Sequence, residues 1–242
     1  DIGMMPDGDD RPCRQNADPS SGAPGRASNQ ETEPEEHWTP TDVFHTRSYW
    51  MIAVSTFLMV FASSGISFNI VPYLQESSSL SSTQAVGVLS LSTSLALANL
   101  VWGYISNRVN PRHSIMGVMT VMTGLILLLF TIKSVYTAFI FGAIWGVCNG
   151  AQEVLMYMLL ARYYGRGSFG SITGTLRPFE AAGLGLGQLS GGLIYDLSGS
   201  YFGMFFGSMG AYVLAIMILM LAVQPMHTQP SKNASCTSGS DA

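Results

Sequence analysis

The chain contains six hydrophobic stretches, and only short polar breaks separate them. A helix needs roughly 20 consecutive apolar residues to cross the hydrocarbon core of a bilayer, and each stretch meets that length. Because lipid offers the backbone no hydrogen-bond partners, we expect every stretch to be helical. The sequence therefore predicts an all-α membrane protein with six transmembrane helices, at residues 49–73, 84–106, 113–133, 136–161, 169–195 and 201–223.

Polar segments flank the hydrophobic region. Residues 1–46 are rich in Pro, Gly, Ser and acidic residues, and residues 225–242 are rich in Ser. Neither segment has enough apolar side chains to offset the entropy lost on folding, so we expect both to be disordered around a transmembrane domain at 47–224. The first residue is Asp1 and no signal sequence precedes the first stretch. We therefore expect the chain to be processed or to begin partway through a longer protein.

Composition excludes several classes of function. Charged residues make up 11% of the chain, against roughly 25% in soluble domains, and the net charge of -4 argues against a nucleic-acid partner. The cysteines, at Cys13, Cys148 and Cys236, and the four histidines are scattered and lack the spacing of a disulfide framework or a metal site. The stretches contain no HExxH or GxSxG motif. We therefore predict no metal, no cofactor and no enzymatic activity.

Arginine in the short connections predicts the orientation. Arg108 and Arg112 follow the second stretch, Arg162 and Arg166 follow the fourth, and Arg47 precedes the first. All five fall on the same side of a six-helix bundle. Because basic residues are enriched in cytoplasmic loops, we expect this side, and with it both termini, to be cytoplasmic.

Charge deep within the stretches is confined to few positions, chiefly Glu153, Arg177 and Glu180. Glu153 lies 12 residues before Gly165 in the cytoplasmic turn, and Arg177 lies 12 residues after it. At about 1.5 Å per residue, both are roughly 18 Å from the turn and near the middle of the membrane. Glu180 is three residues after Arg177 and so shares its helix face. Charges at this depth usually mark an ion or substrate pathway.

Three interpretations of these charges remain open: a salt bridge that joins two helices, a substrate site, and a gating network that rearranges during transport. Burying an ion pair is rarely a net gain in stability, which favours a functional role. Pro178 leaves the carbonyl of Gly174 without its helical partner, so it produces either an ordinary kink or a partly unwound substrate site. Arginine matches a carboxylate with its planar fork, so an anionic substrate is the leading hypothesis.

Other small and polar residues lie near this level. Asn99, Asn149 and Gln152 are candidates either for substrate contacts or for hydrogen bonds between helices. Glycines recur at intervals of four, which places each set on one helix face and allows neighbouring backbones to approach closely. We expect helices that slide or rock at these faces, or static packing there. The two sets are Gly142, Gly146 and Gly150, and Gly183, Gly187 and Gly191.

The segment after the second stretch, Gly103-Tyr-Ile-Ser-Asn107-Arg108-Val-Asn110-Pro-Arg112, resembles a known loop signature. It is similar to the motif G-x-x-x-D-R-x-x-R/K-R/K of the major facilitator superfamily, in the copy between helices eight and nine. In that family the acid and the arginines pair across helix ends and latch one transporter state. Asn107 replaces the acid here, so the resemblance implies a gating loop of Gly103, Asn107, Arg108 and Arg112 with an altered latch.

Longer segments resemble the bacterial monocarboxylate and oxalate/formate branch of that superfamily. They include residues 153–166 and 191–201, Val71-Pro-Tyr-Leu, and the opening residues 1–9. The resemblance implies the C-terminal half of a twelve-helix transporter in a plasma (bacterial inner) membrane, with residues 1–46 in the central cytoplasmic loop and an N-terminal six-helix half as its missing partner. By position, Arg177 is the basic residue that the branch places at its substrate site. Asn99 stands where eukaryotic members have an arginine.

The leading expectation is secondary transport of a small organic anion, a monocarboxylate or dicarboxylate, by alternating access. Arg177 would bind the anion, while Glu153 or Glu180 would hold Arg177 or carry a proton, and a counter-substrate is a further possible partner. One alternative is a transporter of a neutral or cationic solute that uses Glu153 and Glu180 as binding acids. Another is a half-length membrane protein that acts as a scaffold or sensor and does not transport.

Overall fold

The computed structural model describes residues 43–77, 80–95, 99–106, 110–165 and 169–222, and all regular secondary structure in these ranges is helical. The predicted all-α fold is therefore confirmed. Apart from residues 43–46, the two polar tails lie outside the described ranges. The helices are α2 (Arg47–Ser77), α3 (Ser82–Leu95), α4 (Asn99–Ser106), α5 (Pro111–Leu129), α6 (Val135–Tyr164), α7 (Phe169–Ser198) and α8 (Phe202–Leu221).

Four of the described helices are long and apolar enough to cross a membrane: α2, α5, α6 and α8. They correspond to the first, third, fourth and sixth predicted stretches. The fifth stretch forms α7, which has the length, at 30 residues, but is less apolar because it carries charged residues and many glycines. The second stretch corresponds to two helices, α3 of 14 residues and α4 of 8 residues, with residues 96–98 between them outside the described ranges.

Turn-forming residues set the ends of several helices. Asn110 caps α5, where its side-chain oxygen accepts a hydrogen bond from the backbone N–H of Arg112 at 3.3 Å, and Pro111 occupies the first turn. Proline suits this position because the first amides of a helix lack helical partners. Gly165 after α6 and Gly199 after α7 have φ of 75° and 68°. These left-handed conformations favour glycine and end a helix.

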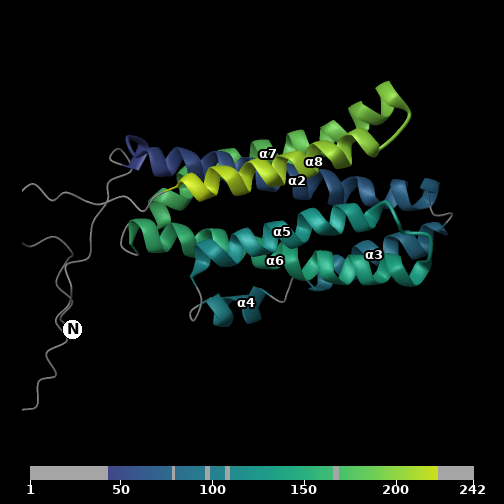
Figure 1. Cartoon of the computed structure of the whole chain (residues 1–242), viewed down its shortest axis with the longest axis horizontal. Helices are drawn as coiled ribbons and strands as arrows, with labels where there is room; N and C mark the ends of the chain where they lie inside the picture. The colour runs from purple at the N-terminus through teal and green to yellow at the C-terminus, as the bar shows by residue number, and fades with distance from the viewer. Residues whose placement is uncertain (1–42, 78–79, 96–98, 107–109, 166–168, 223–242) are drawn as a thin grey trace, which may run out of the picture. The chain divides into compact units, whose positions relative to one another are not determined.

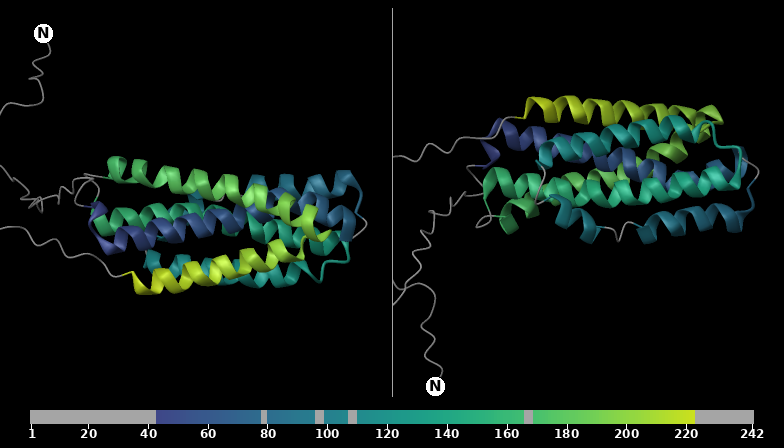
Figure 2. Two further views of the ribbon diagram at one scale, coloured as in Figure 1. Left: turned by 90° about the horizontal axis from the view of Figure 1, so that it is seen from above. Right: turned by 60° about the horizontal axis from the view of Figure 1, so that its bottom comes forward.

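The helices pack in two groups. α2 packs mainly against α7 and α8, whereas α6 packs mainly against α3, α4 and α5. Figure 1 shows α2, α7 and α8 running together along one side of the bundle, and the views of Figure 2 agree. The groups meet where α5 packs against α8 and α2 against α3, while α6 and α7 make few direct contacts. The space between α6 and α7 is therefore not closed by helix packing.

Within the second group, glycines bring α6 close to α3. A Cβ atom at Gly146 would overlap the backbone carbonyl of Ser92, and one at Gly142 would lie 2.7 Å from Cγ1 of Val88. Gly150, the next member of this set, is buried as well. Because helices can approach this closely only where side chains are absent, these glycines are required for the packing of α6 on α3.

Glycines on α7 have the same role against α2. A Cβ atom at Gly183 would lie 2.7 Å from the carbonyl oxygen of Phe57, and one at Gly187 would overlap the carbonyl oxygen of Phe61. Gly191 is also buried on this face. Five of the six glycines identified in the sequence therefore lie where two helices are in close contact: Gly142 and Gly146 between α6 and α3, and Gly183, Gly187 and Gly191 between α7 and α2.

Candidate functional site

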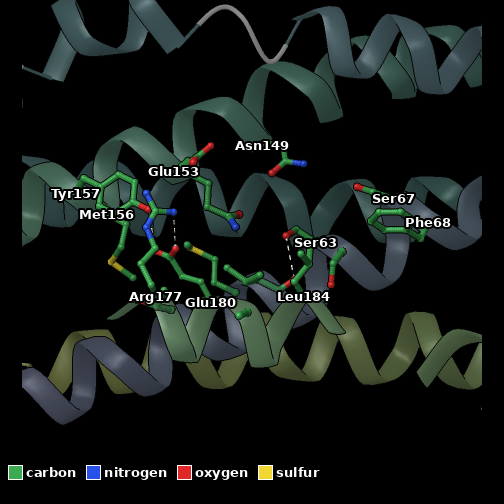
Figure 3. A pocket seen from close by; sticks show the side chains of 16 residues that line it. Ser63, Ser67, Phe68, Asn149, Glu153, Met156, Tyr157, Arg177, Glu180 and Leu184 are labelled. Atoms are coloured by element: carbon green, nitrogen blue, oxygen red, sulfur yellow. Dashed lines mark hydrogen bonds and ion pairs between the residues drawn. The ribbon is translucent and has the colours of Figure 1, made fainter. Parts of the chain in front are cut away.

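A cavity of about 550 Å³ lies between α2, α6 and α7. Its volume falls within the range of small-molecule sites in proteins, which is roughly 300–1,000 Å³. Figure 3 shows a charged group of side chains toward one end of the cavity and uncharged polar side chains toward the other. Five of the six substrate-site residues expected from the sequence line it: Asn149, Gln152, Glu153, Arg177 and Glu180.

The charged end is organised around Glu180. Arg177 Nη1 donates a hydrogen bond to Glu180 Oε2 at 3.0 Å, and the Tyr157 hydroxyl donates one to Glu180 Oε1 at 2.9 Å. The guanidinium carbon of Arg177 lies 5.5 Å from the centre of the Tyr157 ring, a distance suited to a cation–π contact. Both oxygens of the Glu180 carboxylate are therefore occupied, and the three side chains form one cluster between α6 and α7.

Exposure distinguishes the two members of the ion pair. The side chain of Glu180 is 18% exposed, whereas that of Arg177 is 62% exposed. Arginine has five N–H donors in a fixed fork, and the ion pair with Glu180 uses one of them. Arg177 therefore retains N–H groups for a ligand, while Glu180 is committed to holding it. α7 stays helical through Pro178, so the proline does not unwind the helix at this level.

Glu153 lies in the same cavity but outside this cluster. It is exposed on α6, one turn before Tyr157, and Figure 3 shows its carboxylate directed away from Arg177. The ion pair that the structure shows for Arg177 is formed with Glu180, within one helix. Glu153 and Arg177 thus share the cavity, as their matched depth in the sequence suggests, without forming the salt bridge between helices that was one interpretation.

Uncharged polar side chains line the other end of the cavity. Figure 3 shows Ser63, Ser67 and Asn149 there, and Gln152 also lines the cavity. Ser67 Oγ accepts a hydrogen bond from Trp145 Nε1 at 3.1 Å, which joins α2 to α6. Gln152 is only 2% exposed, and its Oε1 atom has no hydrogen-bond partner in the described part of the chain.

Sequence reasoning missed the contribution of α2 and of Tyr157. The serines Ser63, Ser64 and Ser67 interrupt an otherwise apolar stretch at helical spacing, and this pattern was a usable signal for a polar face. Tyr157 lies four residues after Glu153 and therefore on the same face of α6. Its partner Glu180 is on another helix, so the contact depends on how α6 and α7 pack.

Asn99 is the one expected substrate-site residue that does not line the cavity. It begins α4, and its Oδ1 atom is buried without a hydrogen-bond partner among the described residues. Within the predicted gating loop, Gly103 lies in α4, and Asn107 and Arg108 lie outside the described ranges. Arg112 donates a hydrogen bond from Nη2 to the carbonyl of Met220 and so joins the start of α5 to the end of α8.

Across the described residues, no group of three or more His, Cys, Asp and Glu side chains is placed to hold a metal ion. One guanidinium and two carboxylates line the cavity, together with uncharged hydrogen-bonding groups.

Comparison with protein families decides the class of the molecule. The sequence profile of the Major Facilitator Superfamily matches residues 52–238, which is most of the chain. The chain belongs to the major facilitator superfamily. Members of this superfamily are membrane transporters and not enzymes, so the chain is an integral membrane protein of a transporter family. The family match confirms the resemblance seen in the segment at 103–112. None of the curated proteins compared with the chain matches it.

Proposed function

We propose that the chain is the C-terminal six-helix half of a secondary transporter that moves small organic anions, monocarboxylates or dicarboxylates, by alternating access. The observation that carries the proposal is the exposed guanidinium of Arg177 in a cavity between three helices, fixed by Glu180 on its own helix and by the Tyr157 ring. A fixed guanidinium with unused N–H groups binds a carboxylate with little loss of side-chain entropy.

The two acidic side chains take different roles in this proposal. Glu180 is a positioning residue, because both of its oxygens already accept hydrogen bonds from protein groups. Glu153 is the proton carrier, because its carboxylate is exposed in the cavity and is not part of the cluster around Arg177. An anion entering this cavity would place three negative groups near one positive group. Protonation of Glu153 removes one of them, which couples anion binding to proton uptake.

The remaining ionisable groups of the cavity fit this assignment. Tyr157, Arg177 and Glu180 are the other titratable or charged side chains that line it, and the described residues that α2 contributes are uncharged. Glu153 is therefore the acidic group with room to change its protonation state without breaking the Arg177–Glu180 pair. Exchange against a second anion is the other way to balance charge. The response of uptake to an imposed proton gradient distinguishes proton coupling from anion exchange.

The excess of carboxylates supports a second candidate. Two acidic side chains against one arginine are also suited to a neutral or cationic solute, with Glu153 as the binding acid and the Arg177–Glu180 pair as part of the scaffold. This alternative predicts that Arg177 is dispensable for transport. The anion hypothesis predicts the opposite.

In this proposal the membrane topology has six spans. α2, α5, α6 and α8 cross the membrane on their own, α3 and α4 together form the second span, and α7 forms the fifth. The arginine-rich connections face the cytoplasm of a plasma (bacterial inner) membrane, as do both termini. The N-terminal half covers the open side of the cavity, next to the exposed face of Arg177, and completes the substrate pathway.

Uptake of radiolabelled oxalate, formate, lactate and pyruvate into proteoliposomes tests the proposal. The complete transporter is compared with its Arg177→Ala and Arg177→Lys variants, and Arg162→Ala serves as the control because Arg162 is exposed at the end of α6 and does not line the cavity. We expect Arg177→Ala to abolish uptake, Arg177→Lys to restore part of it, and the control to transport normally. Normal anion uptake by Arg177→Ala would refute anion binding and favour the neutral or cationic alternative.

A second arm tests the half-transporter assignment. The 242-residue chain is reconstituted without a partner and compared with the complete transporter in the same vesicles. We expect no uptake above protein-free vesicles, because the cavity lacks its second wall. Uptake by the chain alone at the rate of the complete transporter would overturn the assignment.

A further inference from the structure

One atom in the cavity has a hydrogen-bonding capacity that the described residues do not use. The side chain of Gln152 is buried, and its Oε1 accepts no hydrogen bond from them. A buried acceptor without a donor costs free energy, so most such groups in proteins have a partner. The Tyr212 hydroxyl, which lies beside the Gln152 side chain, donates to Met122 Sδ at 3.4 Å, so we assign the missing donor to a ligand in the cavity that Gln152 lines.

The surroundings of Gln152 favour an uncharged donor. Ser63, Ser67 and Asn149 line the same cavity and contribute hydroxyl and amide groups (Figure 3). Ser63 already donates to the carbonyl of Val60 at 3.2 Å, and Ser67 accepts from Trp145. Neutral groups of this kind bind a hydroxyl well, whereas a fully charged group would lose its hydration without gaining an opposite charge.

The position of Gln152 relative to Arg177 sets the length of the ligand. Gln152 lies five residues before Tyr157 on α6, which corresponds to about 7.5 Å along the helix axis. Tyr157 contacts Arg177, so one extended ligand in this cavity can reach both the guanidinium and the unsatisfied oxygen. Apolar side chains such as Met59, Met156 and Leu184 also line this cavity and suit a hydrocarbon segment.

We propose that the uncharged polar groups of this cavity, with Gln152 Oε1 as the acceptor, select organic anions that carry a hydroxyl group remote from the carboxylate. The inference rests on the proposed function, because it assumes that Arg177 binds the carboxylate. The preferred substrates are then ω-hydroxy acids, in which the hydroxyl donates to Gln152 Oε1 and an apolar chain joins it to the carboxylate.

Competition between matched acids tests the proposal in the complete transporter. Uptake of a labelled anion that it transports is inhibited with ω-hydroxy acids of about three to six carbons and with the unsubstituted acids of equal chain length. We expect the hydroxy acid to inhibit about tenfold more strongly at the best chain length. Equal inhibition by both acids at every length, with anion uptake intact, would overturn the inference and leave the proposed function standing. No inhibition by any acid and no anion uptake would refute both.

The ω-amino acids test whether the far group of the ligand meets a neutral acceptor or a carboxylate. An ammonium group at the far end of the ligand loses its hydration if it meets neutral acceptors, and it gains an opposite charge only if it pairs with the Glu153 carboxylate. We therefore expect ω-amino acids to inhibit less than the corresponding hydroxy acids. Stronger inhibition by the amino acids would assign this end of the cavity to Glu153 and overturn the role of Gln152.

Substitution of Gln152 tests whether this residue causes the preference for the hydroxy acid. Gln152→Met keeps the length and volume of the side chain and removes the acceptor, and Gln188→Met is the matched control because Gln188 is on α7 and does not line this cavity. We expect Gln152→Met to remove the preference for the hydroxy acid over the unsubstituted acid of equal length, and Gln188→Met to keep it. An unchanged preference in Gln152→Met would overturn the assignment. The comparison of acids in the wild type keeps the proposal testable if the variant does not fold.

Discussion

The packing of α7 on α2 predicts that alanine substitution changes stability in opposite directions at two neighbouring glycines. Gly185 and Gly187 are two residues apart in α7, but they face different surroundings. A Cβ atom at Gly185 would meet no atom within 4 Å, whereas one at Gly187 would overlap Ser64 Oγ and the carbonyl oxygen of Phe61. Substitution of each glycine by alanine therefore isolates the contact, because the change in helix propensity is the same at both positions.

The magnitude follows from two opposing terms. Alanine in place of a helical glycine stabilises by roughly 0.5–1 kcal/mol, and at Gly185 this is the whole effect. At Gly187 the carbonyl carbon of Phe61 would also lie 3.1 Å from the new Cβ, where ordinary contact begins at about 3.5 Å, so α7 must shift away from α2. Overpacking of this kind costs about 1–3 kcal/mol. We therefore expect Gly187→Ala to be less stable than Gly185→Ala by about 1–3 kcal/mol.

Thermal unfolding of the purified complete transporter in detergent measures the difference. At roughly 2–4 °C per kcal/mol for domains of this size, the apparent Tm of Gly187→Ala should lie several degrees below that of Gly185→Ala. Gly185→Ala should match or exceed the wild type. Equal Tm values for the two variants would refute the reasoning, because they would show that α7 does not depend on close backbone contact with α2.

Three further predictions follow from individual side-chain contacts. Tyr157→Phe removes the hydrogen bond to Glu180 but keeps the ring beside the guanidinium of Arg177. We therefore expect the KM for anion uptake to rise by about tenfold with the maximal rate little changed. An unchanged KM would contradict a positioning role for Tyr157. Glu153→Gln should abolish the stimulation of uptake by an inward proton gradient while exchange across equal pH persists, and retained stimulation would show that the proton is carried elsewhere. Arg112→Ala removes the hydrogen bond to the Met220 carbonyl and should lower the free energy of unfolding by about 1 kcal/mol, measured as a lower Tm. The order in which competing acids inhibit uptake should not change. A changed order would assign Arg112 a role in the substrate pathway.

Sequence patterns were sufficient for the properties that depend on one helix. Apolar length predicted α2, α5, α6 and α8, because a membrane sets a minimum span. Helical spacing placed Arg177 and Glu180 on one face of α7, and they form an ion pair. Equal depth placed Glu153 and Arg177 at the same level, and both line the cavity.

Properties that depend on how helices pair were not accessible in this way. The cavity has its third wall from α2, which is more than 80 residues before Arg177 in the chain, and no single-helix pattern predicts that contact. The different surroundings of Glu153 and Glu180 also depend on a contact between helices, because Tyr157 on α6 donates a hydrogen bond to Glu180 on α7.

The location of the Arg177–Glu180 pair within a single helix has a consequence for biosynthesis and for motion. Because both partners are on α7, their charges compensate before any neighbouring helix is in place, which in the proposed six-span topology lowers the cost of inserting this weakly apolar segment into lipid. The same pair moves as a unit when α7 shifts against α6, whereas the hydrogen bond and the ring contact from Tyr157 cross between the two helices. In the proposed alternating-access cycle, the Arg177 cation would therefore travel together with the carboxylate that neutralises it.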